Sequence, residues 1–353
     1  MSKKADTKEE IKHIALYRKY RPQEFAEVIG QDHIVKAIKG ALDAGKVSHA
    51  YLLCGPRGTG KTTIARIIAR ELGTSANDIY ELDGASNRKI EDVREIRENI
   101  RTLPFDSKYK VYILDEVHMF TKEAWNALLK TIEEPPEHVI FILATTEMEK
   151  VPETIISRCQ TFTFKKPTDT ILAEIVRNIA KKEGYSIEEG GAELIALLGD
   201  GSFRDTLSTL DKVISFAKGT KISVTDIAEV TGAPEGTLVH DFISALAESN
   251  VELAYSAIAR ASEQNIDVAI YLKMILAQLR FALMLRYAPA MKKEIANTLS
   301  EPDLEFLIDL IAKKPEHISS RSLSILLEAY QSLRYSFISE LPLEIAVVNI
   351  IQK

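Results

Sequence analysis

The sequence predicts an α/β domain built on a parallel sheet, followed by a small helical domain and an all-α C-terminal domain. Between residues 50 and 146, short apolar runs alternate with amphipathic helical stretches. From about residue 170 the strand signals vanish and helical periodicity continues to residue 353. The apolar runs do not alternate with polar residues, which is typical of parallel strands that helices cover on both faces.

The elements of the α/β domain alternate between strand and helix, and Gly55, Gly84, Pro104 and the pair Pro135 and Pro136 mark turns between them. The predicted strands are AYLLCG, IYELDG, KVYILDE and HVIFILATT, and the helices between them are KTTIARIIARELG, KIEDVREIRENIRTL and EAWNALLKTIEE. We expect a flexible polar tail at residues 1–14, the α/β domain at 15–168, a first helical domain at 169–232 and a second at 233–353.

Composition is typical of a folded protein with two or three cores, because 46% of the 353 residues are hydrophobic and 27% are charged. No apolar run approaches the roughly 20 residues that span a bilayer, and the N-terminus lacks a signal peptide, so we expect a cytoplasmic protein without a membrane segment. Cys54 and Cys159 are too far apart to form a C-x-x-C pair, and we expect two buried thiols. The net charge of −6 argues against a surface coated by nucleic acid, but allows a local basic patch.

The most specific motif is GPRGTGKT, which satisfies the phosphate-loop pattern G-x-x-x-x-G-K-[ST] between a strand and a helix. Glycines let backbone N–H groups surround phosphates, Lys61 reaches the β- and γ-phosphates, and Thr62 binds Mg²⁺. The alternative is a chance match in a glycine-rich turn. The residues expected to bind ATP here are Gly55, Pro56, Arg57, Gly58, Thr59, Gly60, Lys61, Thr62 and Thr63.

Acidic and polar residues end the next two apolar strands, where ligands of parallel sheets bind. In VYILDEVH, we expect Asp115 to complete the Mg²⁺ shell and Glu116 to orient or deprotonate the attacking water. An acidic strand end that only caps the following helix is the alternative. In ATTE, Thr145 or Thr146 could position the water, although threonine is also simply a good strand former.

Two arginines stand outside these strand ends. Arg158 lies in IISRCQTF, and a solvated surface charge is its ordinary explanation. Arg204 lies in GSFRD, near the start of a helix. It could reach the phosphates from a separate domain, or form a surface ion pair with a nearby aspartate.

These motifs together resemble the ATPase subunits of bacterial clamp loaders, the gamma/tau family of DNA polymerase III, within the AAA+ ATPases. The resemblance covers roughly residues 15 to 240. It is carried by YRKYRPQEFAEVIGQDHI, HAYLLCGPRGTGKTTIARIIAR, LDGASN, VYILDEVHMF, NALLKTIEEPPEHVIFILATTE, SRC and GSFRD. It implies an AAA+ P-loop domain, a helical lid domain and a C-terminal collar domain that carries oligomerisation.

The resemblance also implies roles for single residues. Arg158 would act in trans, as an arginine finger on the γ-phosphate of ATP held by the neighbouring subunit. Thr146 would be the first sensor, in preference to Thr145, and Arg204 the second sensor in cis. The residues expected over adenine and ribose are Arg18, Pro22, Val28 and Ile29.

A DNA contact is expected on the helix NRKIEDVREIRENIR. Ile90, Val93, Ile96 and Ile100 form its apolar stripe, and basic residues share a neighbouring face. A solvated helix with glutamate–arginine pairs explains the pattern equally well. The resemblance favours contacts to duplex phosphates, made by Lys89, Arg94, Arg97 and Arg101, of which Lys89 and Arg94 match best.

The resemblance therefore implies a clamp-loader ATPase that uses ATP and Mg²⁺ to open the sliding clamp and load it on primer-template DNA. Implied partners are delta- and delta-prime-type subunits and further copies in a pentameric ring. One departure matters: the family usually carries a four-cysteine zinc module before the acidic strand, whereas ELGTSANDIYELDG contains no cysteine, so we expect no zinc. The alternatives are another AAA+ DNA-processing ATPase, for branch migration or repair, an ATP-binding scaffold subunit, and a small-molecule P-loop kinase.

Overall fold

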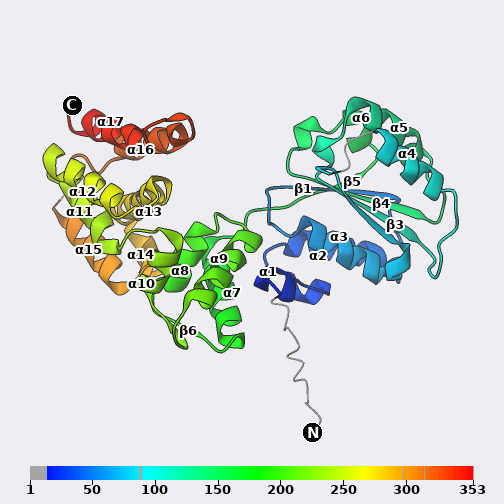
Figure 1. The fold of residues 1–353 in the computed structure, drawn as a ribbon, viewed down its shortest axis with the longest axis horizontal. Coiled ribbons are helices and arrows are strands. Elements are labelled where there is room, and N and C mark those ends of the chain that lie inside the picture. The colour runs from blue at the N-terminus through cyan, green and yellow to red at the C-terminus, as the bar shows by residue number, and fades with distance from the viewer. Residues whose placement is uncertain (1–13, 87–89, 297, 314, 353) are drawn as a thin grey trace, which may run out of the picture. The chain divides into compact units, whose positions relative to one another are not determined.

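The structure is a computed structural model that describes residues 14–86, 90–296, 298–313 and 315–352 (Figure 1). The predicted tail at residues 1–14 therefore lies outside the described residues except for Ile14. The chain divides into two compact units. The first contains the residues up to Ile171 together with Gly201–Leu207, and the second contains Leu172–Asp200 and the chain from Ser208 onward. The first unit contains the five-stranded sheet.

The sheet has five parallel strands in the order β2-β3-β4-β1-β5, which confirms the predicted parallel sheet. Cys54 is in register with Thr145, and Asp83 with Asp115, so the carboxyl ends of these four strands lie at one edge. The strands are β1 (Ala50–Cys54), β2 (Ile79–Asp83), β3 (Lys110–Asp115), β4 (Val139–Thr145) and β5 (Gln160–Thr163).

Helices cover both faces of this sheet (Figure 1). On one face lie α2 (Asp32–Asp43) and α3 (Lys61–Glu71), and on the other lie α4 (Ile90–Asn99), α5 (Lys122–Glu133) and α6 (Glu153–Ile156). The remaining short elements of this unit are α1 (Leu16–Lys19), η1 (Phe25–Glu27), η2 (Ala76–Asp78), η3 (Val117–Met119) and η4 (Met148–Lys150).

Successive strand residues enter two different cores, which explains why the apolar runs do not alternate with polar residues. Leu52 packs with the side chains of α4 and α5, whereas its neighbour Leu53 packs with those of α2 and α3. Each buried leucine contributes roughly 1.5–3 kcal/mol relative to an exposed one. The predicted stripe on α4 is confirmed at Val93, Ile96 and Ile100, which are buried, while the side chain of Ile90 lies outside the described residues.

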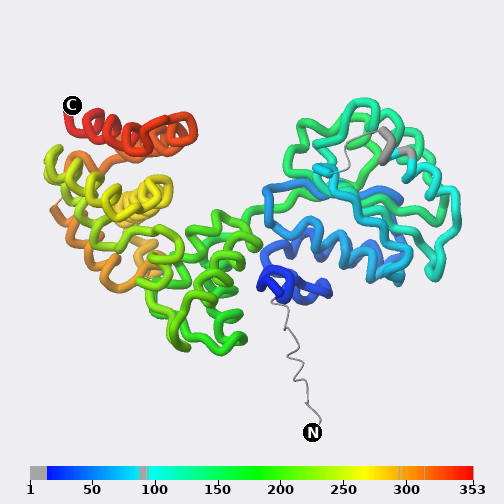
Figure 2. Tube along the Cα trace, viewed as in Figure 1, coloured from blue at the N-terminus to red at the C-terminus, as the bar shows by residue number. Residues whose placement is uncertain are grey.

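The second unit is mainly helical, and Figure 2 traces its chain from green to red. Among the described residues, its core is formed by buried apolar side chains of seven helices. The elements are α7 (Asp169–Lys182) and α9 (Phe203–Phe216), which both begin in the first unit, β6 (Ser186–Ile187), α8 (Gly191–Leu198), β7 (Lys221–Ile222), α10 (Val224–Thr231), α11 (Gly236–Ala247), α12 (Val251–Glu263), α13 (Val268–Tyr287), η5 (Pro289–Met291), α14 (Lys292–Ala296), α15 (Glu301–Ala312), α16 (Ser320–Ser332), η6 (Leu333–Tyr335) and α17 (Leu341–Ile351).

Two expectations about this region were wrong. Strand signals do not end at residue 170, since β6 and β7 form a parallel pair. Each is two residues long, and such a short strand leaves no periodicity to detect. The second expectation was that no apolar run approaches the length of a membrane span. The helix α13 does meet that length and composition. In the structure Tyr271, Leu272 and Ile275 of this helix are buried in the core of the second unit.

Candidate nucleotide-binding site

The glycine-rich loop follows β1 directly at the carboxyl edge of the sheet. Gly55 continues the strand with its N–H donated to the carbonyl of Thr145, 3.2 Å away. Its φ of 149° and its surroundings both require glycine, because a Cβ there would lie 2.7 Å from the carbonyl oxygen of Phe164. The loop therefore lies between the ends of β4 and β5. It leads into α3, which begins at Lys61 and directs its N–H groups toward the loop.

The segment GSFRD is docked on this loop within the first unit. Phe203 donates its backbone N–H to the carbonyl of Gly58 over 3.0 Å, and Ser202 is buried. Gly58 has a φ of 72°, and a Cβ there would lie 1.9 Å from Oγ of Ser202. Glycine is thus required at Gly58 by both backbone and packing. Ser202 was not predicted from the sequence, because its role depends on a contact between distant segments.

Lys61 lies beneath the loop and is 5% exposed. Its Nζ donates hydrogen bonds to the carbonyls of Gly55 and Pro56, at 2.8 and 2.9 Å. Burial lowers the pKa of Lys61, while the carboxylates of Glu116 and Asp115 oppose that shift. A phosphate bound in the loop would offer this ammonium group a stronger acceptor than the two carbonyls.

Thr62 and Asp115 meet at the start of α3 and the end of β3. The hydroxyl of Thr62 donates to Oδ2 of Asp115 over 2.5 Å, and Oδ1 of Asp115 accepts the N–H of Glu116 over 2.9 Å. A hydroxyl and a carboxylate are hard oxygen donors of the kind that Mg²⁺ prefers. These two side chains therefore fit a magnesium ion beside the phosphate loop.

Glu116 has a left-handed backbone, with φ 49° and ψ 43°. Such a conformation is uncommon outside glycine and is often found at functional sites. The segment after β2 holds this part of the backbone in place, because Gly84 donates its N–H to the carbonyl of Asp115 over 2.7 Å. A Cβ at Gly84 would lie 2.6 Å from the carbonyl oxygen of Glu116. The side chain of Glu116 accepts from the hydroxyl of Thr146 over 3.4 Å.

Thr145 and Thr146 differ in their surroundings. Thr145 is fully buried, and its hydroxyl accepts the N–H of Glu147 over 3.0 Å. Thr146 instead directs its hydroxyl at Glu116. His118 of the DEVH stretch was not predicted as a site residue. Its side chain contacts Glu116, Thr145 and Glu147.

Arg18 and Arg204 both approach the ring of Tyr17. Their guanidinium carbons lie 5.7 and 5.2 Å from its centroid, and Arg18 donates to the phenol oxygen over 3.1 Å. The hydrogen bond from Arg18 is the largest influence that holds the pKa of Tyr17 below its usual range. The structure therefore brings the N-terminal segment and GSFRD together. Among the other residues predicted over adenine and ribose, Pro22 is half-buried, Val28 packs partly against the α2–α3 core, and Ile29 is 49% exposed.

Arg158 lies between α6 and β5 and is half-exposed. Its Nη2 lies 2.5 Å from Oε1 of Glu133, and its Nη1 donates to the carbonyl of Thr154 over 2.7 Å and to Oγ of Ser157 over 3.3 Å. These partners belong neither to the phosphate loop nor to the acidic strand end. Within one chain, none of the described contacts of Arg158 involves Lys61 or Asp115.

The residues predicted to contact DNA are described only in part. Lys89 lies outside the described residues, as does the side chain of Arg94. Arg97 in α4 and Arg101 just after it are exposed. Across the described part of the chain, no ion pair of these two arginines is observed.

Cysteine chemistry is not suggested at either thiol. Cys54 is buried as expected, but Cys159 is only half-buried, which corrects the expectation of two buried thiols. Burial raises the pKa of Cys54 and raises that of Cys159 to about 11, so both stay protonated near neutral pH. Over the described ranges, no group of three or more His, Cys, Asp or Glu residues is arranged to hold a metal ion.

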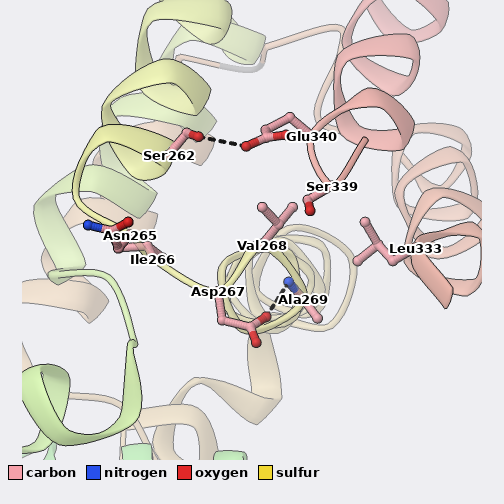
Figure 3. Close-up of a pocket in the computed structure, with 9 residues that line it drawn as sticks. All are labelled: Ser262, Asn265, Ile266, Asp267, Val268, Ala269, Leu333, Ser339 and Glu340. Carbon is pink, nitrogen blue, oxygen red and sulfur yellow. Dashed lines mark hydrogen bonds between the residues drawn. The ribbon is translucent and has the colours of Figure 1, made fainter. Parts of the chain in front are cut away.

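A separate pocket of about 400 Å³ lies in the second unit (Figure 3). It lies between the end of α12, the start of α13 and the segment before α17, where Oγ of Ser262 donates to Oε1 of Glu340 over 2.6 Å. The carboxylate of Asp267 is turned to the N-terminus of α13, where it caps Ala269 and Ile270. Two carboxylates and no basic side chain among its described lining residues make this pocket a poor site for phosphate.

The sheet order, the phosphate loop after β1 and the acidic end of β3 define a P-loop nucleotide-binding domain of the AAA+ class. Solved structures agree. The Holliday junction branch migration motor RuvB of Thermotoga maritima matches with a TM-score of 0.52 and 26% identity, over 64% of this chain and 79% of that one. Three protein families match parts of the chain. They are "DNA polymerase III, delta subunit" at residues 74–168, "DNA polymerase III clamp loader subunit, ATPase lid domain" at 172–219, and "Magnesium chelatase, subunit ChlI" at 24–111.

Curated relatives narrow the likeness within that class. The chain is 38% identical to DNA polymerase III subunit tau of Bacillus subtilis, over 96% of this chain and 63% of that one. It is 39% identical to the gamma/tau subunit of Mycobacterium tuberculosis over 78% of this chain, and 34% identical to subunit tau of Escherichia coli over 82%. Over most of its own length the chain is therefore similar to DNA polymerase III tau and gamma/tau subunits. It spans 63% of the B. subtilis relative and about half of the other two.

Proposed function

We propose that this chain is the ATP-hydrolysing motor subunit of a bacterial DNA polymerase III clamp loader. It uses ATP to open the sliding clamp and load it on primed DNA. The observation that carries the proposal is the contact of Thr62 with Asp115 at one sheet edge, beside Lys61 and Glu116, in a chain whose relatives are tau and gamma/tau subunits. That edge contains the groups that phosphoryl transfer needs.

The geometry supports the roles that we propose within one chain. The N–H groups of the loop and of α3 surround the phosphates, and Lys61 exchanges its two carbonyl acceptors for phosphate oxygens. Thr62 and Asp115 would hold Mg²⁺, which would neutralise phosphate charge. Glu116 orients or deprotonates the attacking water, and Thr146, whose hydroxyl contacts Glu116, acts as the first sensor.

The base and ribose are covered by the N-terminal segment with Arg18, Pro22, Val28 and Ile29. Arg204 acts as the second sensor in cis. Its position supports this role, because the backbone of Phe203 is hydrogen-bonded to the phosphate loop and Arg204 shares Tyr17 with Arg18. A change at the phosphates can therefore be transmitted to the start of α9.

Arg158 acts in trans on the γ-phosphate of a neighbouring subunit. Two observations support this role: the side chain is half-exposed, and its described partners lie outside its own phosphate loop. An arginine finger supplies on the order of 10³ to 10⁵ in hydrolysis rate, far more than a surface ion pair contributes to stability. The site is then complete only in a ring with delta- and delta-prime-type subunits and further copies of this chain, for which we propose a pentamer.

DNA binds through α4. Arg97 and Arg101 are exposed there, and together with Lys89 and Arg94 they would contact duplex phosphates without reading bases. This suits a protein that loads clamps at any primer end. We expect the protein in the cytoplasm, without zinc and without a membrane partner.

The alternatives have less support. The likeness to RuvB, a branch migration motor, is at the level of fold, whereas the tau and gamma/tau relatives match at 34–39% identity over most of this chain. A scaffold subunit that binds ATP without hydrolysing it would not need Glu116 and Arg158, and a small-molecule kinase would need neither a trans arginine nor a helical collar.

The deciding experiment is steady-state ATPase activity of the chain assembled with delta- and delta-prime-type subunits, with and without clamp and primed DNA. We expect primed DNA and clamp to stimulate turnover, and Lys61→Ala to abolish both ATP binding and turnover. A lack of response to primed DNA would favour the alternatives. Turnover that persists in Lys61→Ala would contradict the assigned site.

A further inference from the structure

We propose that His118 is a positioning residue that fixes the carboxylate of Glu116 for attack on the γ-phosphate. The inference rests on the proposed function, because it assigns work to Glu116 that only an ATPase needs. His118 lies in η3, directly after the acidic end of β3, and its side chain is 8% exposed. It is therefore buried among the groups that end β3 and β4.

Both ring nitrogens of His118 face oxygen atoms. Nδ1 lies 3.4 Å from Oε2 of Glu116 and 3.2 Å from Oγ1 of Thr145, while Nε2 lies 3.2 Å from Oε1 of Glu147. Glu147 is itself held by Lys150, whose Nζ lies 2.7 Å from Oε2. A carboxylate on one nitrogen fixes the orientation of an imidazole ring and thereby what its other nitrogen can do. A ring that carries both N–H groups donates from Nε2 to Glu147, which orients it, and from Nδ1 to Glu116.

The contacts on Glu116 are unevenly distributed over its two oxygens. The hydroxyl of Thr146 and the ring of His118 both lie at Oε2. Across the residues that the structure describes, Oε1 has no hydrogen-bond partner. A water molecule that Glu116 activates needs one free acceptor oxygen in a fixed direction. Holding Oε2 from two sides leaves Oε1 as that acceptor.

The backbone alone cannot give this orientation. The left-handed conformation of Glu116 and its contact with Gly84 fix where the side chain begins. The glutamate side chain beyond that point still rotates about several bonds, and ordering it requires further contacts. His118 provides one of these contacts from the same turn of chain. A buried histidine that merely fills a core would be surrounded by apolar groups, whereas this one meets two carboxylates and a hydroxyl.

The test compares His118→Ala and His118→Gln with wild type in the assembled loader, measuring kcat, KM for ATP and the Kd of a fluorescent ATP analogue. Loss of a group that orients a site residue typically costs about 10- to 100-fold in activity. We expect such a fall in kcat for His118→Ala, with KM and Kd changed less than about twofold. Glutamine keeps one N–H donor, so His118→Gln should recover part of the lost kcat. An unchanged kcat, or a loss that appears equally in Kd, would overturn the proposal.

A double mutant separates this inference from the proposed function. Glu116→Gln should abolish most turnover, and in that background His118→Ala should lower kcat no further, because the two residues act as one unit. Full turnover in Glu116→Gln would contradict the function assigned to Glu116. A strong defect in Glu116→Gln with normal kcat in His118→Ala would overturn only the role of His118. If His118→Ala does not fold, Glu147→Ala tests the same chain of contacts and should lower kcat in the same direction.

Discussion

Arg158 and Glu133 form an ion pair within a single chain, with Nη2 of the arginine 2.5 Å from Oε1 of the glutamate. Both side chains are more than a third exposed. An exposed pair of this kind contributes roughly 0–1 kcal/mol to stability, so the arginine can leave it at little cost. A triphosphate on a neighbouring subunit carries more negative charge than one carboxylate and would attract the guanidinium more strongly.

Arg158→Ala should therefore separate turnover from folding and binding. We expect the variant to bind ATP with wild-type Kd and to unfold within about 1 kcal/mol of wild type. Its DNA-stimulated turnover should fall by roughly 10³ or more, because the neighbouring γ-phosphate loses its trans arginine. The measurements are nucleotide titration, urea unfolding and steady-state ATPase of the assembled loader.

Glu133→Gln is the matched control. It removes the partner of Arg158 in the free chain but leaves the arginine, so turnover should stay within about twofold of wild type if the pair is as weak as exposed pairs generally are. Stimulated turnover that survives in Arg158→Ala would rule out a shared site. A collapse of turnover in Glu133→Gln would mean that the pair itself is needed.

Gly58→Ala should uncouple the phosphate loop from the start of α9. The left-handed φ of 72° costs alanine roughly 1–2 kcal/mol, and the new Cβ would overlap Oγ of Ser202. We expect the Kd for ATP to rise by about tenfold or more, since loop and segment must move apart. Gly58→Ala combined with Ser202→Gly should recover part of that affinity.

Gly73→Ala is the control for backbone strain. Gly73 has nearly the same φ, 71°, but a Cβ there would meet nothing within 4 Å. Gly73→Ala should lower the free energy of unfolding by the same roughly 1–2 kcal/mol of backbone strain and leave the Kd for ATP unchanged. Equal losses of ATP affinity in both variants would show that strain, rather than the contact with Ser202, is responsible.

The parts of the site that could be predicted from the sequence are those that local patterns specify. The phosphate loop and Asp115–Glu116 each lie in one short stretch next to a strand, and a parallel sheet brings strand ends to one edge. The contacts of His118 with Thr145 and Glu147, and of Ser202 with Gly58, depend on pairing and docking of distant segments. No spacing of residues in the sequence predicts these contacts.

The same distinction holds for the fold. The apolar runs predicted β1 to β4 within one or two residues, because each strand is rich in apolar residues and helices cover both faces of the sheet. The pair of β6 and β7 was missed, since two residues have no measurable period. The apolar length of α13 was underestimated, and the structure shows that its buried face serves the core of the second unit.

Asp78→Ala should destabilise the protein without affecting the nucleotide site. Asp78 is fully buried before β2, at the sheet edge opposite the phosphate loop, and it accepts the N–H groups of Phe105 and Asp106 over 2.5 and 2.9 Å. Alanine would leave both donors without an acceptor, which costs about 1–3 kcal/mol. Urea unfolding should show this loss while the Kd for ATP stays at the wild-type value. Asp106→Ala, which removes an exposed carboxylate of the same loop, should change stability by less than about 0.5 kcal/mol.

The contribution of Asp78 should also depend on pH. Burial alone would raise the pKa of Asp78, but the hydrogen bonds from Phe105 and Asp106 outweigh it and hold the pKa below its usual range. A carboxylate with a lowered pKa stabilises the folded state above its unfolded pKa, and this stability is lost as pH falls through the folded value. The difference in unfolding free energy between wild type and Asp78→Ala should therefore be constant near neutral pH and shrink below about pH 4. A difference that grows on acidification would contradict this account.

Arg97→Ala combined with Arg101→Ala should weaken DNA binding by the assembled loader in a salt-dependent way. Both arginines are exposed on or just after α4, and removing one phosphate contact reduces the slope of log K against log salt concentration by roughly 0.9. We expect weaker binding of primed duplex DNA at every sequence tested, because phosphate contacts do not read bases. Fluorescence anisotropy over a range of salt concentrations measures both the affinity and the slope.

The control removes two exposed arginines of the second unit, Arg321→Ala with Arg334→Ala, which changes the net charge equally. Equal losses in both double variants would attribute the effect to net charge, and an unchanged slope in Arg97→Ala with Arg101→Ala would remove these two residues from the DNA contact.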